Sequence, residues 1–158
     1  MSEQYLNILM DSLVKKNNIL DEIQRLCKQQ SDILAAEEVD FERFDSCMDN
    51  KDVCIEQLNT LDEGFETLYE RIRDELQEHR EAHADWISKV QKLITEITEK
   101  SVAIQAQEER NKKAVEAAIQ KERQTYNMGK RSVQVATQYY KNMSNTSVIP
   151  PQYMDKKK

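Results

Sequence analysis

The sequence predicts an all-α fold: an elongated antiparallel bundle of three long helices with an extra C-terminal helix and a flexible tail. Only two Gly and two Pro occur among its 158 residues. Helix breakers are therefore rare, and sheet or phosphate-binding folds would lack the glycines that their turns and loops require. Apolar residues also recur at spacings of three, four and seven, which is typical of helices that pack side by side.

The first predicted helix covers residues 3–38. An apolar residue recurs every seven positions along it and forms one stripe. The stripe changes phase just before Asp40, whose side chain can accept hydrogen bonds from the free amides of a new helix. We therefore expect the first turn at residues 37–40. The stripe consists of Leu6, Leu13, Leu20, Cys27 and Leu34.

The second helix is predicted for residues 41–78 and the third from about residue 84 to residue 126. The segment at 77–83 contains neither Gly nor Pro, so both a turn and a continuous helix are open. Gly64 costs about 1 kcal/mol relative to Ala inside a helix and marks a kink, a break or a position that packing keeps helical. On the third helix, Glu108 and Lys112 are expected to pair on the exposed face.

Beyond the third helix, residues 127–129 predict a C-cap. Residues 132–143 follow as a short amphipathic helix. The chain then divides into a helical bundle at 1–126, a C-terminal amphipathic helix at 127–143 and a flexible tail at 144–158.

No pattern of catalytic or metal-binding residues emerges, so we expect neither an enzyme nor a cofactor. His79 and His83 have the spacing of a zinc site, but the metalloprotease pattern is not matched, which favours a role at a helix end or turn. Cys27, Cys47 and Cys54 are odd in number and contain no C-x-x-C pair. They predict unpaired, buried thiols in a reducing cytoplasm.

The charge is distributed unevenly along the chain. Residues 1–110 carry 13 Lys and Arg against 26 Asp and Glu, whereas residues 111–158 carry 10 against 3. A nucleic-acid role for this basic arm is disfavoured, because the acidic part would repel a polyanion. The arm more simply folds along the acidic part or meets an acidic partner. Short apolar runs and the absence of a signal-peptide pattern predict a cytoplasmic protein without membrane insertion.

An apolar stripe continues into the basic arm, beyond the reach of the first two helices. Such a stripe is the form that a helix-in-groove or coiled-coil contact takes. Folding back onto the bundle, or a homodimer, is an equally open alternative. The stripe comprises Ile119, Tyr126, Val133 and Tyr140 at a spacing of seven, with Val115, Ala136 and Met143 on the neighbouring track.

The layout resembles the flagellar export chaperones of the FlgN/FliT type. These are small, acidic, all-helical cytosolic proteins with two antiparallel helices, a long third helix and a loose C-terminal end. The resemblance spans nearly the whole chain. It is carried by Glu37-Glu38-x-Asp40, Asn50-Lys51-x-x-x-Ile55-x-x-Leu58-x-x-Leu61, Ile97-x-x-Lys100, Glu108-Glu109-Arg110-Asn111, Tyr139-Tyr140-Lys141-Asn142-Met143 and the segment 149–155.

This resemblance implies a chaperone that is not an enzyme and that binds late export substrates, the hook-filament junction or filament-cap proteins. It also implies transfer to the flagellar export apparatus, in which a C-terminal tyrosine takes part in some members. A coiled-coil adaptor or homo-oligomeric scaffold without a client is the alternative. The residues expected to bind partners are Val115, Ile119, Tyr126, Val133, Ala136, Tyr139 and Tyr140.

Overall fold

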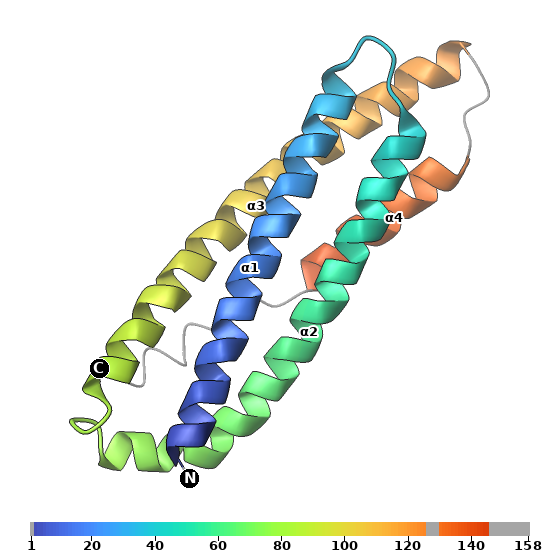
Figure 1. Cartoon of the computed structure of the whole chain (residues 1–158). Coiled ribbons are helices and arrows are strands. Elements are labelled where there is room, and N and C mark those ends of the chain that lie inside the picture. Colours follow the sequence, from blue (N-terminus) through green and yellow to red (C-terminus); the bar gives the residue numbers. More distant parts are fainter. Residues whose placement is uncertain (1, 126–129, 146–158) are drawn as a thin grey trace.

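The computed structural model describes residues 2–125 and 130–145, with side chains for residues 3–123 and 136–143, and contains four helices in these ranges (Figure 1). Three are long, α1 (Ser2–Ala35), α2 (Phe41–Glu78) and α3 (Ala84–Thr125), and α4 (Lys130–Asn145) is short. The predicted bundle of three long helices with an extra C-terminal helix is thus confirmed. The predicted C-cap at 127–129, and residues 146–158 of the predicted tail, lie outside the described residues.

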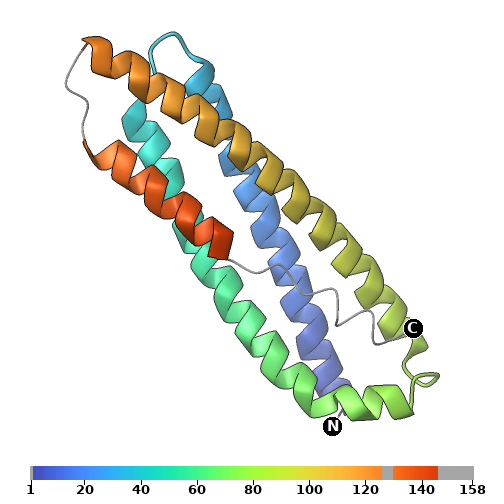
Figure 2. The same cartoon turned by 180° about the vertical axis from the view of Figure 1, so that it is seen from behind.

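The central helix of the bundle is α1, which packs against both α2 and α3. The short helix α4 packs against α2 and α3 on the side opposite α1 (Figure 2). It covers the part of their seam that lies towards the α1–α2 turn. Four helices therefore surround the core at this end, whereas three form the other end.

The start of the second helix is as predicted, but the first helix ends three residues earlier than the predicted residue 38. α1 ends at Ala35, and Asp40 is the N-cap of α2. The Arg43 backbone amide donates a hydrogen bond of 3.1 Å to Oδ1 of Asp40, which satisfies one of the amides that a helix start leaves free.

The second turn separates α2 from α3, so the alternative of a continuous helix is not observed. His79 is the C-cap of α2, and its backbone amide donates to the Glu75 carbonyl at 2.9 Å. The His83 carbonyl accepts from the Ile87 amide at 2.9 Å, at the first turn of α3. Both histidines thus lie at helix ends, and the turn is made by backbone hydrogen bonds without Gly or Pro.

The core is a continuous apolar cluster made of side chains from all four helices. Its members in α1 and α2 follow the predicted stripes closely, including Leu13, Met48 and Ile72. Gly64 lies within α2 without interrupting it, and a Cβ atom at this position would meet nothing within 4 Å. No helix in the described part of the chain is long and apolar enough to cross a membrane.

Candidate partner-binding site

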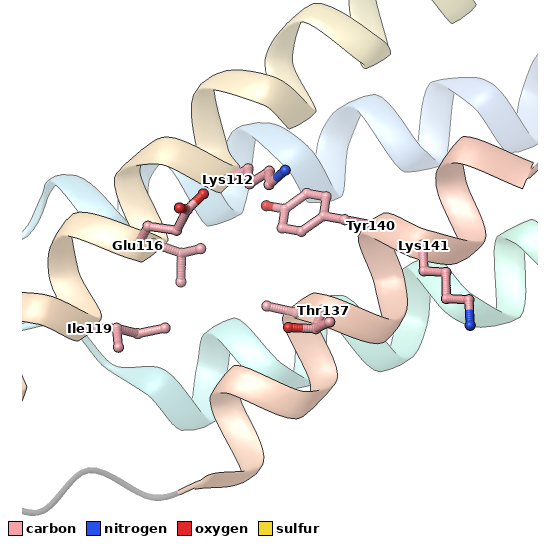
Figure 3. A pocket seen from close by; sticks show the side chains of 8 residues that line it. Lys112, Glu116, Ile119, Thr137, Tyr140 and Lys141 are labelled. Carbon is pink, nitrogen blue, oxygen red and sulfur yellow. The ribbon is translucent and has the colours of Figure 1, made fainter.

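A groove of about 490 Å³ runs between α3 and α4 (Figure 3). Its floor is apolar and its rim carries charged side chains from both helices. In Figure 3, Tyr140 reaches from α4 towards Lys112 on α3. The lining residues are Lys112, Val115, Glu116, Ile119, Ala136, Thr137, Tyr140 and Lys141.

Four of the seven residues expected to bind partners line this groove. Val115 and Ala136 are buried, at 1% and 5% exposure, whereas Ile119 and Tyr140 are half-buried. Because α4 packs on α2 and α3, the described part of the C-terminal stripe folds back onto its own bundle. Tyr126 lies outside the described residues, and Val133 lies in α4 but its side chain is not described.

The neighbouring tyrosines of α4 occupy different environments. Tyr139 is fully buried, whereas Tyr140 is half-buried in the groove, and their rings meet edge to face with centroids 5.5 Å apart. Burial raises the pKa of both phenols above the ordinary value. Both side chains are therefore neutral at physiological pH, and each presents a ring with a polar tip.

Tyr139 reaches a buried ion pair between α2 and α3. The Lys51 ammonium lies 2.8 and 3.0 Å from the two carboxylate oxygens of Glu108, and both side chains are almost fully buried. The same ammonium lies 4.0 Å from the centroid of the Tyr139 ring and 3.8 Å from Sγ of Cys27. Asn111 completes the cluster, because its side-chain amide donates to the Cys27 carbonyl at 2.9 Å.

The expectation for Glu108 was wrong. It does not pair with Lys112 on the exposed face but lies in the core, 3% exposed, opposite Lys51. The missed signal was its spacing, because Glu108 continues the core track that passes through Ile97 and Ile104. An i,i+4 charge pair is a weak local signal, and the position on the buried face decides where the carboxylate lies.

The three cysteines are free and buried. Burial, as the largest cause, raises the pKa of the Cys27 thiol to about 12, so this thiol is protonated at neutral pH and is a poor nucleophile. No group of three His, Cys, Asp or Glu side chains that could hold a metal ion occurs among the residues that the structure describes.

These features define the class of the protein: a small all-helical bundle with a groove between its third and fourth helices. The family model described as "FlgN protein" matches residues 1–147. The chain therefore belongs to the FlgN family, a family of flagellar export chaperones. No curated protein and no solved structure matches it significantly.

Proposed function

We propose that this chain is a cytoplasmic chaperone for hook-filament junction or filament-cap proteins, which it binds through its C-terminal helical region and delivers to the flagellar export apparatus. Its family membership supports the general role. The groove between α3 and α4 supports the choice of the C-terminal region, because four of the residues predicted from the sequence to bind partners line it. We propose that all seven of those residues belong to the client-binding region.

The chemistry of the groove indicates what kind of client segment it suits. Ile119 of α3 and Tyr140 of α4 are half-buried in the groove and give apolar surface that an amphipathic helix would cover, at about 25 cal/mol per Å² of apolar area removed from water. Lys112 and Lys141 lie at the rim and are exposed. A client helix with acidic residues beside its apolar face would therefore be steered to this end of the molecule.

The test is binding of the hook-associated protein encoded in the same operon by the full-length chain. Ile119→Asp places a charge on the groove floor, and we expect the client affinity to fall at least about tenfold, since the charge must be desolvated on binding. Val102→Asp is the matched control, because Val102 also lies on α3, is 60% exposed and does not line the groove. Equal affinity of the two variants in calorimetry would place the client elsewhere.

The alternative of a homo-oligomeric scaffold without a client has one observation in its favour. A second groove, of about 590 Å³, runs between α1 and α2 and is lined by Ile19, Val53 and Leu61 among others. Val53 is 54% exposed. The scaffold hypothesis requires a stable oligomer in light scattering that Val53→Asp dissociates, together with no retention of a hook-associated protein.

A further inference from the structure

Gly64 of α2 is not required by the packing of the bundle itself. A glycine inside a helix is less stable than an alanine at the same position. The φ angle of Gly64 is not positive, and a Cβ atom there would meet no atom of the described residues within 4 Å. An alanine would therefore fit. A close approach to the α2 backbone from outside the bundle, by contrast, does call for a residue without a side chain.

The groove between α1 and α2 leads to this glycine. The groove has a volume of about 590 Å³, and Thr60 and Leu61 are among its lining residues. Gly64 follows these two residues by four and three positions, so it lies on the same face of α2, one turn further along. Leu68, which is half-buried, continues this face after another turn. A helix lying in the groove would thus reach the α2 backbone at Gly64, where no side chain holds it away.

The same groove exposes apolar side chains on both of its helices. Val53 of α2 lines it and is 54% exposed, and Ile19 and Leu61 are half-buried in it. Ile8 of α1 is 46% exposed and precedes Lys15 and Ile19 by seven and eleven positions, which places it on the same face. Single exposed apolar residues are common, but apolar residues aligned along one groove are typical of a surface that binds an amphipathic helix.

The charges around the groove indicate which helix would bind there. α2 carries 4 Lys and Arg against 12 Asp and Glu. Asp49, Glu56 and Glu63 are exposed and recur every seven residues, and Glu56 lines the groove, whereas Lys15 lies on the α1 side. A two-fold contact between two copies through α2 would place these acidic rows against each other, which is unfavourable. A helix with basic residues on the side that faces α2 has the complementary charge.

We propose that the groove between α1 and α2 is a docking site for a basic amphipathic helix of another protein, with Gly64 at the point of closest approach. The apolar face of this helix covers Ile19, Val53 and Leu61, and its Lys or Arg residues face the acidic row of α2. The site is separate from the groove between α3 and α4, because α4 packs on the side of α2 and α3 opposite α1 (Figure 2). The chain can therefore hold two partners at once, and this second site does not rest on the proposed function.

The first experiment measures the binding of two designed helical peptides to the full-length chain by fluorescence anisotropy. Both peptides have about 20 residues, with Leu and Ala on one face and either Lys or Glu beside it. The Lys peptide should bind at least about tenfold more tightly than the Glu peptide. The charge-reversed chain, Glu56→Lys with Glu63→Lys, should abolish this preference. An unchanged preference in the reversed chain would place the peptide elsewhere and overturn the proposal.

Gly64→Leu separates binding from folding. A Cβ atom at this position has open space, so the melting temperature of the variant should not fall. Its affinity for the Lys peptide should nevertheless fall at least about tenfold, because the new side chain holds the peptide away from α2. Thr95→Leu, at an exposed position of α3, is the matched control and should leave the affinity unchanged. Equal affinities of the two variants would contradict the proposal.

Val53→Asp distinguishes docking in the groove from general attraction to an acidic protein. The substitution adds a negative charge, so binding by charge alone would stay the same or become tighter. Docking in the groove should instead weaken at least about tenfold, because the new charge must be desolvated, and unchanged binding would overturn the proposal.

Light scattering and client binding complete the test. A dimer of the native chain that Val53→Asp dissociates would assign the groove to a second copy and overturn the partner assignment. Gly64→Leu should leave the affinity for a hook-associated protein unchanged, whereas Ile119→Asp should leave the affinity for the Lys peptide unchanged. The failure of this proposal and the failure of the proposed function can therefore be recognised separately.

Discussion

Two lysines lie in the apolar stripes of this bundle, and their surroundings differ. Lys16 of α1 pairs with Asp62 of α2 at 2.6 Å, and the Asp62 side chain is 20% exposed. Lys51 of α2 pairs with both oxygens of Glu108, whose side chain is 4% exposed. The Lys51 ammonium also lies against the Tyr139 ring of α4, so the C-terminal helix covers the second pair.

The comparison shows how burial and pairing compete. Burial lowers the pKa of Lys16 and raises the pKa of Asp62, although each faces an opposite charge that acts in the other direction. Desolvation thus outweighs attraction in this pair. Oδ2 of Asp62 has no hydrogen-bond partner among the described residues, whereas both oxygens of Glu108 have one. The more deeply buried pair is also the better satisfied one, as a buried charge requires.

The largest expected effect on the free energy of unfolding comes from removing one charge from the Lys51–Glu108 pair. Glu108→Leu leaves the Lys51 ammonium buried without its carboxylate, and we expect the free energy of unfolding to fall by about 3–5 kcal/mol. Adding Lys51→Met should restore most of this stability, because an apolar pair of similar volume replaces the charges. Urea denaturation of the three chains measures both changes. A single variant as stable as the double variant would show that Lys51 reaches water in the folded state.

A smaller loss is expected for the more exposed pair. Asp62→Leu leaves Lys16 without its partner, but at a position that water reaches more easily, so we expect a loss of about 1–2 kcal/mol in the same denaturation experiment. Lys16→Met in the Asp62→Leu chain is the matched control and should recover it. If Asp62→Leu costs as much as Glu108→Leu, the difference in burial between the two pairs does not decide their energetics.

The smallest effect is a pH dependence. Burial raises the pKa of Asp62 above its ordinary value of 3.8, so the folded chain binds this proton more tightly than the unfolded chain. Asp62 therefore contributes stability below pH 3.8 that is lost as the pH rises through its raised pKa. The unfolding free energy of the native chain minus that of Asp62→Asn should accordingly decrease as the pH rises towards neutrality. An increase would mean that the attraction to Lys16 outweighs burial.

Much of the fold could be read from local signals. The scarcity of Gly and Pro, the apolar stripes and the Asp40 cap located α1, α2 and the first turn. The second turn stayed ambiguous, because it is closed by backbone hydrogen bonds at His79 and His83 and not by a breaker residue. Half-buried residues such as Ile119 and Tyr140 were selected from their spacing, and the structure places them in one groove.

The ion pair could not be read in the same way. Lys51 and Glu108 lie 57 positions apart, and no local rule connects them. Each occupies a stripe position where an apolar residue is the ordinary expectation, and the charge of Glu108 suggested an exposed face. Only the tertiary structure, which brings Lys51 of α2 next to Glu108 of α3, shows that each charge is the other's partner.

The sequence by itself determined that the chain is helical and where its second helix begins, because helix formation depends on neighbouring residues, on caps and on the absence of breakers. The acidic bundle and the basic arm also follow from the sequence alone. The tertiary structure decided where the arm lies, which tyrosine faces the core and which charges are buried together. Those outcomes depend on the removal of water from surfaces far apart along the chain, which no short stretch of sequence specifies.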